Sequence, residues 1–135
     1  MGKLRHIAIT VRDPEKTATF YEQTFGMQRV SNHALGVMLS DGIVSLAILN
    51  FPTDAMAGDK RGKDFEGLHH IGFMVDDINA SQAAVKANGG RHHMTLPTVD
   101  GVDSDDTEHK FFDPDGVVFD IVNQDYAEGF WGAKG

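Results

Sequence analysis

The chain has 135 residues, with 20 acidic against 12 basic side chains, a formal net charge of −8 and no cysteine. This length suits one domain, the negative charge argues against binding nucleic acid or an anionic membrane surface, and the absence of cysteine excludes disulfides and thiolate chemistry. No apolar run approaches the ~20 residues of a membrane span, and the N-terminus lacks the apolar core of a secretory signal. We therefore expect a cytoplasmic protein.

The chain repeats itself at a spacing of 64 residues, the distance between His6 and His70. Residues 4–13 and 68–77 share Leu, His, Ile, Val and Asp at matched places, and both runs alternate as strands do. A repeat of this kind sets the architecture, because one unit alone cannot bury its apolar faces.

Each predicted strand is followed by a predicted helix. Asp13-Pro14 predicts a helix start and Gly26 a left-handed stop. In the second copy, Asp77 and Gly89-Gly90 play these parts. Three strand-like runs then follow each helix: about 27–33, 35–40 and 43–50 in the first half, and about 91–96, 108–112 and 117–123 in the second.

These elements predict an α+β fold, in which two tandem βαβββ units form a curved eight-stranded open barrel with helices outside. The predicted single domain, 1–135, has four parts: a first unit at about 1–50, a linker at about 51–67, a second unit at about 68–125 and an aromatic tail at 126–135. The linker has at most one short helical turn. About ten extra residues in the second unit fall in the acidic stretch 96–108, which we expect to be a loop or a lid.

Three side chains form a candidate metal site. His6 and His70 stand at equivalent places in two equivalent strands, so a pseudo-twofold axis would turn both imidazoles into one concave space. Asp120 lies in the apolar final strand, where an unpaired carboxylate is costly and a metal ion would supply the countercharge. Counting from the hairpin glycines places Leu46 at the matching position of the first half, and leucine cannot coordinate. We therefore predict two histidines and one carboxylate, with other metal positions open.

The remaining histidines have open interpretations. A two-residue turn at Pro114-Asp115 places His109 opposite Asp120, as a candidate proton shuttle, whereas a glycine bulge places Lys110 there instead. His69 precedes a predicted ligand, so on a strand it faces the other way, where we expect it to pack or to meet solvent. Either His92 or His93 faces the concave side, with a possible part in substrate binding.

The aromatic tail contains the only tryptophan, Trp131. It caps the pocket mouth, anchors on a second subunit or packs on the surface of its own domain.

The chain resembles the vicinal-oxygen-chelate superfamily, which includes glyoxalase I, extradiol dioxygenases, methylmalonyl-CoA epimerase and metal-free bleomycin-resistance proteins. The motifs that carry the resemblance are Leu-x-His-Ile at 4–7 and 68–71, Phe20-Tyr21 before Phe25-Gly26-Met27, and Phe112-Asp113-Pro114-Asp115-Gly116. The resemblance implies an open barrel around a divalent metal and places His6, His70 and Asp120 on ligand positions. It also implies a homodimer. Glyoxalase I and the epimerase carry a fourth ligand where this chain has Leu46, and glutamate is usual in place of Asp120.

From this pattern we expect a metal-dependent enzyme that acts on a small oxygen-rich substrate, with one divalent ion per site. Three ligands favour ring-cleavage dioxygenase chemistry with Fe(II), and Mn, Ni or Zn would favour proton or group transfer. The alternatives are a metal-free protein that sequesters a small molecule in the same cleft, and a glyoxalase-type lyase.

Overall fold

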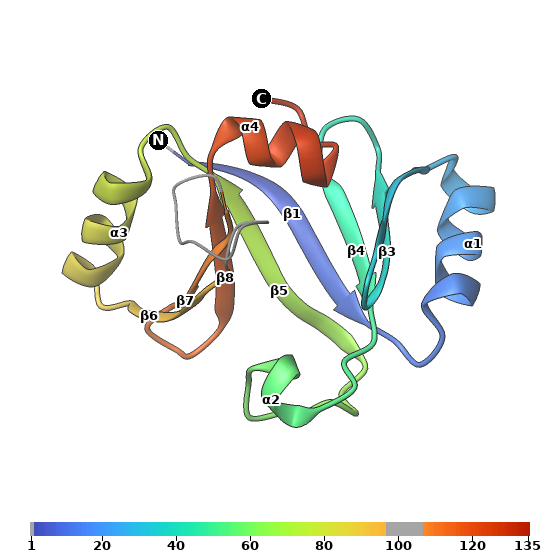
Figure 1. The fold of residues 1–135 in the computed structure, drawn as a ribbon, viewed down its shortest axis with the longest axis horizontal. Coiled ribbons are helices and arrows are strands. Elements are labelled where there is room, and N and C mark those ends of the chain that lie inside the picture. Colours follow the sequence, from blue (N-terminus) through green and yellow to red (C-terminus); the bar gives the residue numbers. More distant parts are fainter. Residues whose placement is uncertain (1, 97–106) are drawn as a thin grey trace.

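The computed structural model describes residues 2–96 and 107–135, and its elements follow the predicted order (Figure 1). Most of the predicted acidic loop or lid, 96–108, lies outside the described residues. The first unit contains β1 (Lys3–Thr10), α1 (Pro14–Phe25), β2 (Gln28–His33), β3 (Gly36–Ser40) and β4 (Ser45–Leu49). The linker carries the short α2 (Asp54–Ala57). The second unit contains β5 (Gly67–Met74), α3 (Ile78–Ala87), β6 (Arg91–Thr95), β7 (His109–Phe112) and β8 (Val118–Val122). The tail forms α4 (Gln124–Tyr126) and a π-helical turn, η1 (Ala127–Trp131).

The two main helices begin and end as their sequences predict. The side chains of Asp13 and Asp77 accept hydrogen bonds from the backbone N–H groups of Lys16 and Ala80, in the first turns of the two helices. Gly26 closes α1 at φ 70°, a left-handed conformation that glycine adopts without steric cost.

The eight strands form one sheet in the order β2-β3-β4-β1-β5-β8-β7-β6. The order of the second half mirrors that of the first, and the halves join where β1 and β5 pair antiparallel. Ile7 lies opposite Ile71, its own equivalent in the repeat, so the local twofold axis passes between these two residues. The predicted fold class, an open curved sheet built from two βαβββ units, is confirmed.

The helices cover the two faces of the sheet differently. On the outer face, α1 packs through Ala18 on Leu39 and Ile48, and α3 packs through Ile78 on Phe111 and Ile121. The inner, concave face carries a third apolar cluster to which α2 and the tail contribute. Figure 1 shows α4 between the two halves, over the central strands, with α2 at their opposite end.

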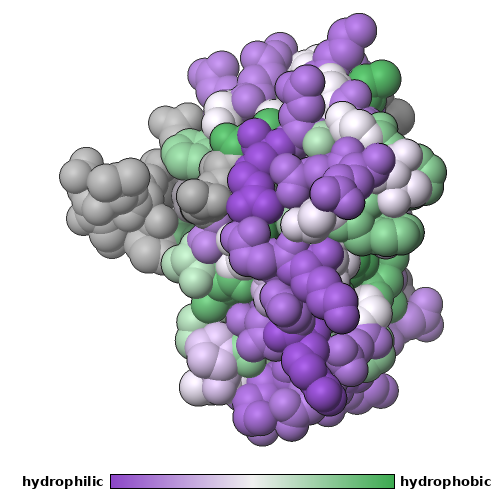
Figure 2. Space-filling model, turned by 90° about the vertical axis from the view of Figure 1, so that its right-hand side faces the viewer, coloured by the Kyte–Doolittle hydropathy of each residue, from purple (hydrophilic) through white to green (hydrophobic). Residues whose placement is uncertain are grey.

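The outer surface around α1 is mainly hydrophilic, with apolar patches toward its margins (Figure 2). Within the described part of the chain, no helix is both long enough and apolar enough to cross a bilayer.

Candidate metal centre

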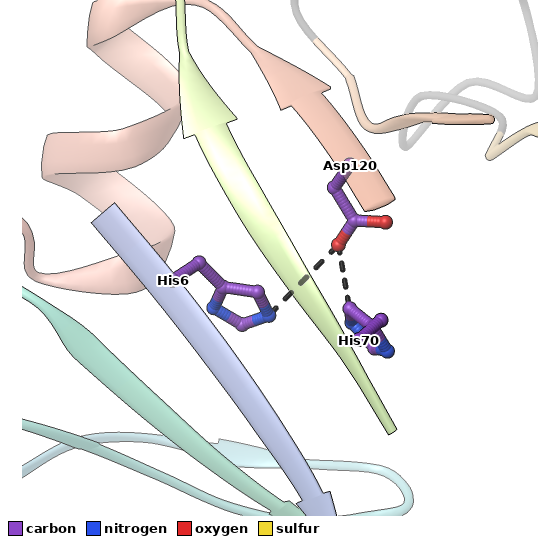
Figure 3. Close-up of side chains that lie close together, drawn as sticks. All are labelled: His6, His70 and Asp120. Carbon is purple, nitrogen blue, oxygen red and sulfur yellow. Dashed lines mark ion pairs between the residues drawn. The ribbon is translucent and has the colours of Figure 1, made fainter. Parts of the chain in front are cut away.

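The structure brings His6, His70 and Asp120 together on the concave face (Figure 3). The histidines come from the two central strands, β1 and β5, and their ring centroids lie 5.4 Å apart. Asp120 comes from β8, where Gly72 of β5 is its neighbour across the ladder. One potential ligand atom from each of the three residues lies within 4.8 Å of the others, and all three side chains are buried.

One carboxylate oxygen of Asp120 faces both imidazoles. Its Oδ2 lies 3.2 Å from Nε2 of His70 and 3.9 Å from Nε2 of His6. This buried Oδ2 forms no hydrogen bond to the described residues. A buried oxygen without a partner is costly, and a cation among these three atoms would remove that cost. The arrangement therefore fits a metal ion bound by two nitrogens and one oxygen.

The outward-facing nitrogens of both rings are already engaged. Nδ1 of His6 lies 2.6 Å from Oγ of Ser45, and Nδ1 of His70 lies 2.7 Å from Nδ1 of His69. Such contacts fix the ring orientation and tautomer of metal-bound histidines, and leave Nε2 to the ion. Burial lowers the pKa of His6 to about 3, outweighing the opposite effect of Asp120. His6 is therefore neutral near pH 7, as a metal ligand must be.

Lys110 neutralises Asp120 from the other side. Its Nζ lies 2.7 Å from Oδ1 of Asp120 and 3.5 Å from Oε2 of Glu108. Burial alone would raise the pKa of Asp120, but the charge of Lys110, followed by that of His70, outweighs it and holds the pKa below its usual range. Asp120 is thus ionised, with one oxygen engaged by Lys110 and the other turned to the histidines.

The β7–β8 register decides between the two predicted neighbours of Asp120. Lys110 lies opposite Asp120, and His109 lies opposite Ile121 on the outer face. Nδ1 of His109 lies 3.3 Å from Oγ1 of Thr95 and 3.4 Å from Nε2 of Gln82 in α3. The prediction of His109 as a proton shuttle required it beside Asp120, and the structure does not bring it there. The bulge alternative, with Lys110 opposite, is the one observed.

The first-half equivalent of Asp120 is Ala47, and the assignment to Leu46 was wrong by one residue. Gly72 faces Asp120 across its ladder, and the repeat equivalent of Gly72, Ala8, faces Ala47. The error arose because two residues separate Gly42 from the start of β4, whereas one residue separates Gly116 from the start of β8. Leu46 points to the outer face. Alanine has no donor atom, so the conclusion of three protein ligands is unchanged.

The tail lies directly on the site. The Trp131 ring stacks on that of His6, with centroids 4.2 Å apart and planes 11° apart. Its Nε1 donates a hydrogen bond of 3.1 Å to Oε1 of Glu108. Trp131 is 1% exposed. Of the three placements considered for the tail, packing on its own domain is observed, and it closes one side of the site.

Gly72 makes this packing possible. A Cβ atom at this position would lie 2.7 Å from the Trp131 ring and 2.8 Å from Cβ of His6. We expect Gly72→Ala to lower the free energy of unfolding by about 1–3 kcal/mol, because the added methyl group would overpack the core. Since the chain has one tryptophan, a shift of its fluorescence emission should accompany the lower melting temperature.

Gly129→Ala is the matched control, because a Cβ at Gly129 would meet no atom within 4 Å. An unchanged melting temperature and emission in Gly72→Ala would contradict the close packing of Trp131 against His6.

A cavity of about 870 Å³ lies next to the cluster, between α2, the start of β5 and the β7–β8 hairpin. His69 lines it, together with apolar side chains that include Phe112 and Val118. The charged side chains of the lining are three cations and three carboxylates: Lys60, Arg61, Arg91, Asp54, Asp59 and Asp115. The guanidinium of Arg91 lies 4.5 Å from the centre of the Phe112 ring. This volume is in the range of small-molecule sites.

His92 and His93 lie on opposite faces of the sheet. His93 stacks on Phe112, with ring centroids 4.4 Å apart, and lies close to Gly58 of the linker. His92 packs edge-on against Phe111 and bonds Thr95.

Comparisons with known proteins agree on one family. The model of the Glyoxalase/Bleomycin resistance protein/Dioxygenase superfamily matches residues 3–121. The human mitochondrial methylmalonyl-CoA epimerase is 35% identical over 98 residues, which cover 64% of this chain and 53% of that protein. The chain thus spans about half the length of the mitochondrial epimerases it matches.

Solved structures share the fold. The methylmalonyl-CoA epimerase of Streptomyces coelicolor, in complex with 2-nitronate-propionyl-CoA, superposes with a TM-score of 0.67 at 25% identity, over 90% of this chain and 96% of that chain. The Mn(II)-bound glyoxalase of Novosphingobium aromaticivorans superposes with a TM-score of 0.61 at 19% identity, over 90% of this chain and 38% of that chain. At that identity the glyoxalase supports the fold alone.

Proposed function

Because the chain belongs to the Glyoxalase/Bleomycin resistance protein/Dioxygenase superfamily, we propose that it is a divalent-metal-dependent enzyme whose ion is held by His6, His70 and Asp120. The observation that carries this proposal is the buried Oδ2 of Asp120, which forms no hydrogen bond to the described residues and faces two imidazole Nε2 atoms. A donor set of two imidazoles and one carboxylate suits Mn, Fe, Co, Ni or Zn.

We further propose that the reaction is proton transfer at the carbon next to a thioester carbonyl, as in an epimerase. The human mitochondrial protein and the Streptomyces coelicolor protein described above, which are 35% and 25% identical to this chain, are methylmalonyl-CoA epimerases and support this reaction. They do not support dioxygenase chemistry, which we expected from the three-ligand pattern, nor a glyoxalase-type lyase. When bound, the ion would polarise the carbonyl oxygen and stabilise the negative charge that develops there.

The chain's own residues offer acid–base groups on the inner face. Glu108 and Lys110 extend from the same end of β7, and Lys110 bridges the carboxylates of Glu108 and Asp120. Asp120 is occupied as a ligand in this scheme, so Glu108 is the carboxylate that we propose as proton acceptor. The Nε1–H of Trp131 holds Oε1 of Glu108 and orients the group.

The cavity beside His69 suits the long tail of a thioester of coenzyme A. Lys60 and Arg91 offer positive charge for phosphates, and Phe112 with Val118 offers apolar surface for an aliphatic arm. The cavity borders His69, which contacts His70, so a tail bound there would place its acyl end near the proposed ion.

Metal analysis is the first test. Protein purified without chelator, or reconstituted with Mn, Fe, Co, Ni or Zn, should bind about one ion per chain, and a His6→Ala/His70→Ala variant should bind none. If the wild type binds no ion but retains a small ligand, the metal-free binding protein is the correct interpretation.

Deuterium exchange tests the reaction. Metal-loaded protein incubated with methylmalonyl-CoA in D₂O should exchange the α-proton, followed by ¹H NMR. Glu108→Gln should slow exchange by about 100-fold or more, because general-base catalysis contributes typically 10²–10⁴-fold. Stoichiometric metal without exchange would contradict the thioester reaction while leaving the metal centre in place.

A further inference from the structure

Each of the two proposed histidine ligands is preceded by a β-bulge. In the β1–β5 ladder the register shifts between Leu4 and His6 and again between Ala8 and Ile9, opposite His70 and Leu68. Arg5 and His69 are therefore the extra residues, and they occupy the same place in the two repeats. A bulge breaks the alternation of side chains and re-aims one of them. His69 consequently turns toward His70, whereas a regular strand would point it to the opposite face.

The two bulged residues contact very different surroundings. Arg5 is partly buried, and its guanidinium donates to the backbone carbonyls of Lys134 and Leu4. His69 is 4% exposed, its ring lies 4.9 Å from that of Phe51, and its Nδ1 lies 2.7 Å from Nδ1 of His70. The second bulge thus places one imidazole behind another.

We infer that His69 is a positioning residue that orients His70 toward the ion, an inference that rests on the proposed role of His70 as a ligand. An ion on Nε2 of His70 requires the ring hydrogen on Nδ1. That hydrogen is donated to Nδ1 of His69, the ring atom 2.7 Å away. His69 must then carry its own hydrogen on Nε2.

The surroundings of His69 favour this tautomer. Its Nε2 forms no hydrogen bond within the described residues, but it lies 3.6 Å from Oδ2 of Asp59, a nearly buried carboxylate that favours a hydrogen on this nitrogen. Arg61 holds that carboxylate with two hydrogen bonds, of 2.7 and 3.0 Å, and also donates to the backbone carbonyl of His69. Hydrogen bonds thus join Arg61 to Asp59 and His69 to His70, and a 3.6 Å contact between Asp59 and His69 lies between these two pairs. His6 is held differently, by the single hydroxyl of Ser45.

Two substitutions separate positioning from packing. His69→Leu fills similar space without a hydrogen-bonding atom, whereas His69→Asn retains an oxygen close to the position of Nδ1. We expect His69→Leu to raise the Kd for Zn²⁺ by about 10–100-fold, the range measured for partners of metal ligands. His69→Asn should restore the affinity to within about threefold of the wild type.

Zn²⁺ affinity should be measured by competition with a chromophoric chelator, alongside the tautomers of both histidines by ¹⁵N NMR of the Zn²⁺-loaded protein. We expect hydrogen on Nδ1 of His70 and on Nε2 of His69. Arg5→Ala is the matched control, because it alters the equivalent bulge without touching an imidazole, and its affinity should equal that of the wild type.

Two results would overturn the inference alone: a folded His69→Leu variant that binds Zn²⁺ as tightly as the wild type, or a His69→Asn variant as weak as His69→Leu. Failure of the wild type to bind any of the tested metals would instead overturn the proposed metal centre, and the role of His69 with it.

Discussion

Lys110→Met is expected to lower the free energy of unfolding of the metal-free protein by about 3–5 kcal/mol near neutral pH. The substitution removes the ammonium that lies 2.7 Å from Oδ1 of Asp120 and leaves a buried carboxylate without its main countercharge. Removing one partner of a buried ion pair has a cost of this size, because the remaining charge stays desolvated. Chemical denaturation at several pH values measures the effect.

The pH dependence has a definite sign. In the wild type the pKa of Asp120 is held below its unfolded value of 3.8, so the stability from this group is present above that value and is lost as the pH falls through the folded pKa. Without Lys110, burial raises the pKa of Asp120. Mild acid then protonates the carboxylate and removes the cost of an unpaired buried charge. The difference in the free energy of unfolding between Lys110→Met and the wild type should therefore become smaller as the pH falls from about 7 to about 4.

A bound cation should compensate for the lost ammonium. If Zn²⁺ binds the variant, it should raise the melting temperature of Lys110→Met more than that of the wild type, because the ion supplies charge to the same carboxylate. Lys63→Met is the control: Lys63 forms a surface pair with Asp64, and such pairs contribute about 0–1 kcal/mol. A Lys110→Met variant as stable as this control would show that Lys110 does not balance the buried charge.

The architecture was predictable from the sequence because it depends on patterns that repeat. Capping aspartates, apolar alternation and the 64-residue spacing of the histidines each act locally, and each appears in both halves. The twofold relation between units then follows, since strands that pair about a symmetry axis bring equivalent residues together. For this reason the sequence alone predicts that His6 and His70 lie on one face of the sheet.

The details of the site depended on single-residue shifts that alternation does not reveal. One extra residue in the β7–β8 turn decides between His109 and Lys110. One extra residue between the hairpin glycine and β4 moves the first-half equivalent of Asp120 from Leu46 to Ala47. A bulge turns His69 toward the site. The paired histidines at 69–70 were visible in the sequence, but their contact requires a bulge whose position depends on the partner strand.

The tail was unpredictable for a different reason. Trp131 contacts His6, 125 positions earlier in the chain, and nothing in the local sequence from Tyr126 onward distinguishes this placement from a subunit contact. Its position depends on the absence of a side chain at Gly72 and on Glu108 as a hydrogen-bond acceptor. Gly72 and Glu108 come from the second repeat, and His6 comes from the first. The packing of Trp131 therefore joins the tail to both halves.

Trp131→Ala is accordingly expected to lower the free energy of unfolding by about 3–5 kcal/mol, the usual cost of truncating a buried aromatic side chain, and the melting temperature by about 10–20 °C. The loss comprises the stacking on His6 and the hydrogen bond to Glu108. The stability of Trp131→Phe should be intermediate between those of the wild type and Trp131→Ala. This variant retains a ring over His6 but leaves the Glu108 carboxylate without its hydrogen-bond donor. Phe130→Ala, which alters a neighbouring ring that is 56% exposed, is the matched control and should be close to the wild type.

The same variants identify the route by which small molecules reach the site. If access is through the face that Trp131 covers, Trp131→Ala should release its ion to EDTA faster than Phe130→Ala does, and His6 should react faster with diethylpyrocarbonate, as followed by peptide mass spectrometry. Equal rates in the two variants would contradict entry past the tail. Entry would then be by the cavity beside His69, where Arg91 and Lys60 lie, and Arg91→Ala should weaken binding of a coenzyme A thioester while leaving ion release unchanged.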